Sequence, residues 1–210
     1  PTAFESYGAF QGEKRDVLEG GYRVPTIVWG PEMVKAGAVD NNPSQFHDWM
    51  ATFLDFADLP IPARIDGVSL KPTIMGSGVQ ESGTAYTEYS VPNSTPSYFE
   101  HHAGRTRQEQ QSVYLDGYKG IREGVTDHQV PFRIYDTLVD PEESLDLADL
   151  PSGDPRKPRF EALAERMKDE VLRIRQPHPT QTRAYDNALV PAVAEEWVGA
   201  TRVYRFEGSW

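Results

Sequence analysis

Residues 12–29 read GEKRDVLEGGYRVPTIVW, and they hold the densest group of structural signals in the chain. Gly20 and Gly21 indicate a turn, because glycine permits a positive φ or a close approach of two backbone segments. Residues 22–29 are mostly apolar and β-branched, which predicts a buried strand. Proline cannot donate a backbone hydrogen bond to a neighbouring strand, so Pro25 predicts that the first positions of this segment lie at the strand entry. Such a strand is typical of the middle of a large sheet.

Beyond this strand, an amphipathic helix is predicted over residues 43–58. Asn42 and Pro43 form a favourable N-cap and first helical position. Apolar residues then recur at helical spacing: Phe46, Met50, Phe53, Leu54 and Ala57. His47 and Asp48 are neighbours at the front of this helix, but consecutive helical residues diverge by about 100°, so the pair does not act on one atom. We expect structural roles for both, with Asp48 holding the loop that precedes the helix.

The second half of the chain is richer in strand signals. Residues 83–91 and 132–137 each predict a strand. Residues 111–123 predict two short strands joined by Asp116-Gly117, a dipeptide that favours tight hairpin turns. Residues 159–175 carry an apolar stripe at helical spacing and predict a helix that packs on this scaffold. The fold class is therefore α/β at the start, leading into α+β with a small antiparallel sheet packed by a C-terminal helix.

The composition limits the classes of function. The chain has 210 residues and a formal net charge of −11, which argues against a broad nucleic-acid surface. Cysteine is absent, so disulfides, thiolate metal sites and a cysteine nucleophile are excluded within these residues. No apolar run reaches the length of a membrane-spanning helix, and residues 1–20 show no signal-peptide pattern. The sequence therefore predicts a globular protein without nucleic-acid or membrane partners.

Four motifs in a fixed order carry a family resemblance. The first contains Gly-x-Lys at 12–14, followed by Glu-Gly-Gly-x-Arg-x-Pro at 19–25. The others are DGVSL at 66–70, DGYK at 116–119 and the segment RIYDTLVDPEESLDLA at 133–148. Together they cover roughly residues 8–150 and resemble the type I, formylglycine-dependent sulfatases of the alkaline phosphatase superfamily. One such motif alone is weak evidence, whereas four in order indicate common ancestry.

The resemblance implies an organisation. Residues 1–75 would end the catalytic α/β core, 76–176 would form a C-terminal subdomain, and 177–210 a tail or linker. In this family the formylglycine nucleophile and the paired aspartates for calcium lie upstream of the first motif, so we expect this chain to supply neither group and to be inactive alone. The intact protein would hydrolyse sulfate esters of a carbohydrate. Family members from bacteria are usually exported, which is our expectation for localisation.

Lys14 is the residue of the first motif that we expect to be catalytic. By resemblance its ammonium would contact the sulfate group, where it would stabilise the negative charge that develops during ester cleavage. Arg23 is expected to form a structural ion pair or to cover an apolar surface near the site. Gly20 and Gly21 would let the backbone pass close to the site, and Glu19 would be a structural partner.

The polar stretch 92–110 is the second source of candidate site residues. It is predicted to be irregular, and long polar loops often carry binding residues. Its cations and imidazoles are candidate contacts for an acidic sugar: His101, His102, Arg105 and Arg107. Adjacent histidines without a third ligand are weak evidence for a metal, so no metal site is assigned. The acidic residues at 140–143 resemble a helix start and not a calcium loop.

Two other functions remain open at this point. A phosphomonoester or phosphonate hydrolase of the same superfamily would share this scaffold, although the GEKR…EGG pattern favours a sulfatase. A non-catalytic glycan-binding or interaction module is the third possibility. Such a module would have to be stable alone, whereas a core strand over 22–29 would expose an adhesive edge in an isolated chain.

Overall fold

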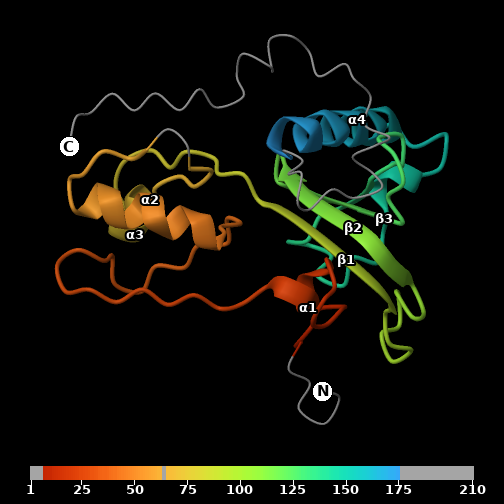
Figure 1. The fold of residues 1–210 in the computed structure, drawn as a ribbon, viewed down its shortest axis with the longest axis horizontal. Helices are drawn as coiled ribbons and strands as arrows, with labels where there is room; N and C mark the ends of the chain where they lie inside the picture. The colour runs from red at the N-terminus through yellow and green to blue at the C-terminus, as the bar shows by residue number, and fades with distance from the viewer. Residues whose placement is uncertain (1–6, 63–64, 176–210) are drawn as a thin grey trace. The chain divides into compact units, whose positions relative to one another are not determined.

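The computed structural model describes residues 7–62 and 65–175, which fall into two compact units (Figure 1). The first unit comprises residues 7–24 and 86–175 of the described chain, and the second comprises the intervening residues from 25 to 85. The predicted tail over 177–210 lies outside the described residues. The predicted division between residues 75 and 76 stays a prediction. Within the described ranges, no helix is both long and apolar enough to cross a membrane.

The first unit is built on an antiparallel sheet of four strands in sequence order, β1-β2-β3-β4. The strands are β1 (Tyr86–Ser94), β2 (Thr106–Leu115), β3 (Tyr118–Glu123) and β4 (Arg133–Tyr135). Both residues of the β2–β3 turn have positive φ, 53° at Asp116 and 82° at Gly117. This is the geometry that tight hairpins favour and that Asp-Gly adopts easily. The hairpin prediction is confirmed.

The predicted irregular stretch 92–110 is corrected by the structure. Residues 92–94 belong to β1, and β2 begins at Thr106, so the connection between them covers only 95–105. The pairs Ser94 with Thr106 and Val91 with Gln108 extend the ladder into the polar stretch. Backbone pairing with β1 outweighs the low strand propensity of this glutamine-rich sequence.

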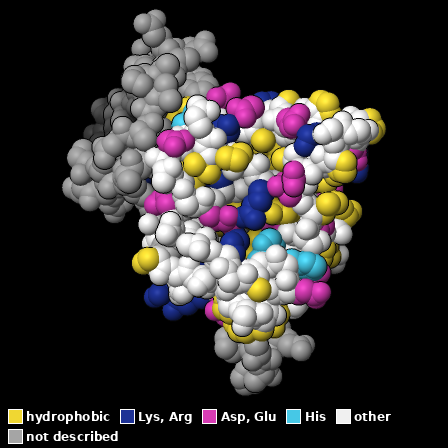
Figure 2. Space-filling view, turned by 90° about the vertical axis from the view of Figure 1, so that its right-hand side faces the viewer, with side chains coloured by type: hydrophobic (Ala, Val, Ile, Leu, Met, Phe, Trp, Pro, Cys, Tyr) yellow, Lys and Arg dark blue, Asp and Glu magenta, His cyan; other side chains and the backbone are white. Residues whose placement is uncertain are grey.

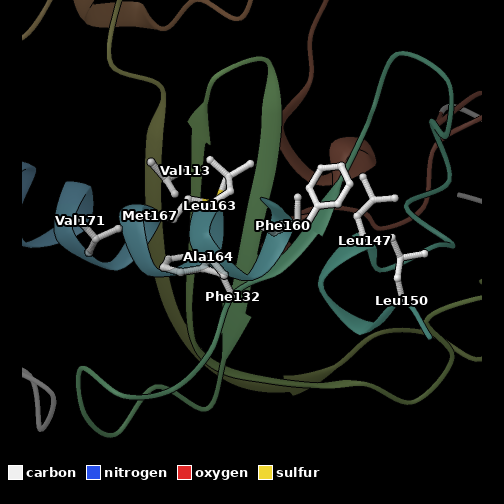
Figure 3. Packing of buried hydrophobic residues seen from close by; sticks show 10 residues of the cluster. Val113, Phe132, Leu147, Leu150, Phe160, Leu163, Ala164, Met167 and Val171 are labelled. Carbon is white, nitrogen blue, oxygen red and sulfur yellow. The ribbon is translucent and has the colours of Figure 1, made fainter. Parts of the chain in front are cut away.

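Helix α4 (Lys157–Ile174) covers one face of the sheet (Figure 1). Its buried apolar residues meet Val113 and Ile134 of the sheet, with Phe132 beside them (Figure 3). The helical contribution comes from Phe160, Leu163, Ala164, Met167 and Val171. Burying such side chains stabilises the unit by about 1.5–3 kcal/mol each. The predicted helix over 159–175 and its packing role are confirmed.

The N-terminal segment covers the opposite face of the same sheet. Val17 and Leu18 are fully buried against Ile121 and Tyr135. Alternation along β3 explains the division, because successive side chains point to opposite faces. The segment includes the single helical turn α1 (Glu19–Tyr22), which the sequence predicted as a turn.

The second unit contains α2 (Phe46–Phe56) and the short α3 (Lys71–Met75). The N-cap of α2 is Gln45 and not the predicted Asn42, because Gln45 N–H donates to Asp48 Oδ2 (2.7 Å). The contact of Asp48 with the preceding loop was expected, whereas its second contact, an acceptor role toward Val68 N–H after the helix (3.0 Å), was not. Helix α3 was not predicted from the sequence.

The apolar segments of this unit are exposed. The predicted strand over 22–29 has no strand conformation, and Ile27 and Trp29 are 92% and 85% exposed. The apolar stripe of α2 is similarly accessible, with Phe46 87% exposed and Phe53 65% exposed. The strand prediction is therefore wrong for this chain, because no strand among the described residues pairs with this segment and its residues Ile27 and Trp29 lie in water.

Candidate functional site

The loop that presents Lys14 is a tight reversal between Gln11 and Leu18. Asp16 N–H donates to the carbonyl of Glu13 (3.0 Å), which closes the turn. Gly12 and Arg15 both have positive φ, 86° and 72°. Lys14 is exposed, and no side chain among the described residues pairs with its ammonium group. This cation is therefore available to a ligand.

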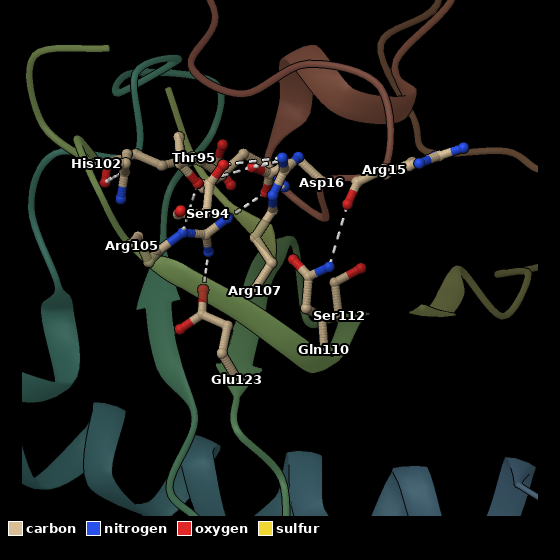
Figure 4. A network of polar contacts seen from close by, with 12 residues as sticks. Arg15, Asp16, Ser94, Thr95, His102, Arg105, Arg107, Gln110, Ser112 and Glu123 are labelled. Carbon is tan, nitrogen blue, oxygen red and sulfur yellow. Dashed lines mark hydrogen bonds and ion pairs between the residues drawn. The ribbon is translucent and has the colours of Figure 1, made fainter. Parts of the chain in front are cut away.

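Asp16 connects this loop to Thr95 and Arg105. Its carboxylate is buried and accepts hydrogen bonds from Leu18 N–H (3.1 Å) and Thr95 Oγ1 (3.0 Å). It also forms an ion pair with Arg105, which contacts Glu123 on its other side (Figure 4). The Arg105 guanidinium is thus enclosed between two carboxylates.

Two side chains of β2 donate hydrogen bonds to backbone carbonyls of this loop, at Lys14 and Arg15 (Figure 4). Arg107 is 2% exposed, and its guanidinium donates to the carbonyls of Lys14 (3.2 Å) and Ser94 (2.9 Å). Gln110 Nε2 donates to the carbonyl of Arg15 (3.1 Å). Two consecutive carbonyl groups of the loop therefore have side-chain partners from one strand.

Gly20 and Gly21 lie where two backbone segments nearly touch. A Cβ at Gly20 would lie 2.4 Å from the carbonyl oxygen of Gly12, and one at Gly21 would lie 2.2 Å from that of Asp16. These distances are far below van der Waals contact, so neither position has room for a side chain. The two glycines act through close approach and not through a positive φ.

Arg23 lies at the end of this segment. Its guanidinium pairs with Glu19 at 3.1 Å and stacks over the ring of Phe10, 4.8 Å from the centroid. Both interactions expected from the sequence, the ion pair and the apolar cover, are present together. Whether Arg23, Gly20 and Gly21 support a catalytic site stays a prediction.

A buried ionic cluster beneath α1 was not found by sequence reasoning. Lys119 on β3 is completely buried, and its ammonium lies 2.8 Å from Glu19 Oε1 and 2.7 Å from Glu143 Oε1. Glu143 also accepts from the backbone N–H of Glu19 (2.8 Å), and Tyr114 donates to the Glu19 carboxylate. The ring of Tyr22 lies 4.6 Å from the ammonium. Glu19, Glu143 and Lys119 therefore share a buried site, and the partly exposed Arg23 is a second cation at Glu19.

The electrostatics of this cluster follow from its composition. Burial alone would raise the pKa of Glu19, but Lys119 and the Tyr114 hydroxyl outweigh it and lower that pKa. Burial would lower the pKa of Lys119, but Glu143, Tyr114 and Glu19 outweigh it and raise that pKa. Burial raises the pKa of Glu143, and it outweighs the opposite effect of the Lys119 ammonium. Glu143 has a positive φ of 54° in a turn, so of the turn or helix start predicted over 140–144 the structure has the turn.

The two adjacent histidines have different environments. His101 is exposed and its Nε2 lies 3.2 Å from Glu142. His102 is buried, and its Nε2 donates to the carbonyl of Glu143 (2.9 Å), which fixes the proton on that nitrogen. Burial, followed by the charge of Arg105, lowers the pKa of His102 to about 4.

The four predicted substrate contacts are therefore not equivalent. His102, Arg105 and Arg107 make their observed contacts with the protein itself, whereas His101 keeps an accessible ring. Tyr98 adds a contact that the sequence did not indicate, because its hydroxyl donates to Glu13 (2.6 Å) beside Lys14. The substrate-binding assignment stays a prediction for all four residues.

The surface around these residues carries mixed charge. Figure 2 shows Lys and Arg side chains next to Asp and Glu, with histidines close by, and the described residues on that face form no broad area of one charge. Among the described residues, no group of three or more His, Cys, Asp or Glu side chains could hold a metal ion. Lys14 offers an accessible ammonium on a loop whose backbone is hydrogen-bonded to β2.

Comparisons with known proteins place the same segment in a family context. A family profile described as N-sulphoglucosamine sulphohydrolase, C-terminal, matches residues 6–177. The N-acetylglucosamine-6-O-sulfatase of Bacteroides thetaiotaomicron is 32% identical over 144 residues, which cover 65% of this chain and 24% of that protein. The N-acetylgalactosamine-6-sulfatase of Homo sapiens is 38% identical over 77 residues, which cover 36% of this chain and 15% of that protein. The chain spans about a quarter or less of these relatives.

A solved structure is also similar to this chain. It is a protein in complex with its substrate, D-glucosamine-2-N,6-O-disulfate, and it matches with a TM-score of 0.47 and 22% identity. The match covers 72% of this chain and 29% of that structure.

Proposed function

This chain belongs to the N-sulphoglucosamine sulphohydrolase, C-terminal, family, and from this membership we propose that it forms part of a sulfatase that hydrolyses sulfate esters of an amino sugar. The observation that carries the proposal is the profile match over residues 6–177, which includes the loop of Lys14. Two curated relatives named as hexosamine 6-sulfatases support the substrate class.

We propose that Lys14 supplies this chain's direct contribution to the chemistry. Cleavage of a sulfate ester develops negative charge on the transferred sulfuryl group and on the leaving oxygen. An ammonium that is fixed by its backbone and unpaired among the described residues stabilises that charge more in the transition state than in the ground state. The Lys14 side chain has this combination of rigid attachment and free charge.

The cofactors of the family enter only as part of this proposal. A formylglycine would supply the nucleophile and calcium would polarise the sulfate. On the family resemblance alone, we assign both groups to parts of the relatives that this chain does not match. The activity of the described residues alone is proposed to be negligible.

From the polar connection between β1 and β2, we propose His101 as the residue that faces the sugar. Its ring is accessible and pairs only with the exposed Glu142 among the described residues, so a ligand could displace that contact. His102, Arg105 and Arg107 would contribute to sugar binding indirectly, by holding the protein around His101 in place. Export from the cell is proposed from the family alone.

The test uses the full-length protein with two pairs of substrates. N-acetylglucosamine-6-sulfate and an aryl sulfate are compared with the corresponding phosphate monoesters. We expect hydrolysis of the sulfates, and we expect Lys14→Ala to lower kcat by about 100-fold to 1,000-fold. Preferential hydrolysis of the phosphates would replace the sulfatase proposal with a phosphatase.

Arg15→Ala is the matched control for Lys14→Ala. It removes one positive charge from the same loop, and the Arg15 side chain extends away from the polar network (Figure 4). We expect Arg15→Ala to retain activity within about threefold. Equal losses in the two variants would mean that the general charge of the loop, and not Lys14 itself, supports the reaction.

A further inference from the structure

Arg107 is buried although its side chain is charged, and its Nη1 lies 3.7 Å from the carboxylate of Asp16. A guanidinium is costly to remove from water, and an apolar side chain of similar size often stabilises a fold as well or better. Yet Arg107 is 2% exposed and directs its Nη1 and Nη2 atoms at the carbonyls of Lys14 and Ser94. Its guanidinium therefore links the backbone of Lys14 to Ser94 at the end of β1.

Gln110 makes the neighbouring contact in the same way. It is completely buried, and its Nε2 donates to the carbonyl of Arg15. Arg15 has a φ of 72°, a conformation that is unfavourable for a non-glycine residue. The hydrogen bond from Gln110 offsets part of that cost and keeps the reversal immediately after Lys14.

From these contacts we infer that Arg107 and Gln110 are positioning residues for Lys14. The inference rests on the proposed function of Lys14. Each side chain fixes one of two consecutive carbonyls, so together they set the position of the Lys14 backbone and the direction in which its side chain leaves the loop. Asp16, the residue after Arg15, forms an ion pair with Arg105, so the next position of the loop is also held by a side-chain contact. A displacement of about 1 Å at such a group can reduce a rate about 100-fold.

This inference differs from the sequence prediction that Arg107 contacts the substrate. A residue that acts through Lys14 affects the rate only while Lys14 is present, whereas a direct substrate contact acts in either background. A double-mutant cycle separates the two, because it measures whether the effects of two substitutions are independent.

The experiment uses the full-length protein and an aryl sulfate. We expect Arg107→Met to lower kcat about 10-fold to 100-fold with a smaller change in KM, and Arg107→Lys to recover part of the loss. In the Lys14→Ala background, Arg107→Met should cause no further loss. Equal losses from Arg107→Met with and without Lys14 would overturn the inference.

A second pair of variants covers the case in which Arg107→Met fails to fold. Gln110→Leu removes one donor to the loop, and Gln108→Leu makes the same change at an exposed position of β2. We expect only Gln110→Leu to lower kcat. Equal kcat values for the two variants would count against a positioning role for Gln110.

Hydrogen exchange supplies a readout that does not depend on sulfatase activity. In Gln110→Leu, the peptide that covers residues 11–18 should exchange faster than in the native protein, while α4 should exchange at an unchanged rate. Unchanged exchange in 11–18 would overturn the positioning role even if no sulfate ester is hydrolysed. Faster exchange without any activity in the native protein would instead mean that the proposed function is wrong.

Discussion

Residues 11–23 bury charged and apolar side chains against the sheet, whereas residues 24–29, which follow directly, expose an apolar run. Glu19 is 3% exposed and Leu18 is fully buried, while Ile27 is 92% exposed. By hydrophobicity alone, the isoleucine should be buried and the glutamate exposed. The difference lies in the partners, because β2 and β3 offer hydrogen-bond donors and a cation to the first segment.

This comparison shows that burial in the chain follows complementarity between segments. A carboxylate is stable inside when an ammonium and N–H or O–H donors meet it, as they meet Glu19. An isoleucine stays at the surface when no apolar partner is nearby. The following changes test each side of the comparison.

The largest effect is expected at the centre of the buried cluster. Lys119→Met leaves the Glu143 carboxylate without its cation and leaves Glu19 with the partly exposed Arg23, and breaking such a buried pair costs about 3–5 kcal/mol. Urea denaturation followed by circular dichroism measures the loss. Adding Glu143→Gln to Lys119→Met should recover part of it, because one uncompensated charge disappears. A loss below about 1 kcal/mol would show that the cluster is not needed for stability.

A smaller loss is expected where the two backbone segments meet. Gly21→Ala would place a Cβ 2.2 Å from the carbonyl oxygen of Asp16, which forces one segment to move at a cost of about 1–3 kcal/mol. Gly153→Ala is the matched control, because a Cβ at that position would have no other atom within 4 Å. Thermal unfolding of both variants compares them. Equal midpoints would contradict the close approach.

A further reduction in stability is expected from acidification. The pKa of His102 is about 4 in the folded chain, whereas an unfolded histidine titrates near about 6.5. Between these values the unfolded state binds a proton that the native state does not, so stability falls as the pH decreases from about 6.5 to about 4 and is fully present above that window. NMR titration of the His102 ring measures the shift. A midpoint at the unfolded value would contradict the buried, neutral imidazole.

The smallest effect is expected in the exposed run. Ile27→Ser and Trp29→Ser should change the free energy of unfolding by less than about 0.5 kcal/mol, because both side chains are in water. Light scattering should show less self-association in the double variant, since exposed apolar surface drives association. A loss of about 2 kcal/mol or more would mean that these side chains pack within the folded chain.

Local patterns predicted much of the fold. The Asp116-Gly117 turn, the stripe of α4 and the helical spacing of α2 each depend on residues near one another in sequence. The strand over 22–29 failed because its prediction assumed partners that the described chain does not provide. The early start of β2 was missed because pairing with β1, and not its own composition, makes it extended.

The candidate site was predictable only in part. Lys14 and the two glycines follow from a motif, and the structure places Gly20 and Gly21 in α1, against the backbone of the loop that carries Lys14. The buried cluster of Lys119 with Glu143 could not be found by spacing, because a long stretch of unrelated sequence separates the two residues. One signal of the cluster was present in the sequence, because Lys119 lies on a predicted strand beside Gly120 and Ile121. A charged side chain in such an apolar setting needs a buried partner.

The distances in sequence between the loop and its partners have a consequence for the order of folding. The sheet is a meander in which each strand pairs with the next, so its contacts close short loops. The contacts of the Lys14 loop instead join residues 93 and 95 positions apart, at Arg107 and Gln110. We expect β1–β4 and α4 to assemble first and the segment of residues 11–23 to dock last, although it precedes the sheet in the sequence. Mild denaturation should then release the loop while the sheet persists, so catalytic competence would be lost before the fold.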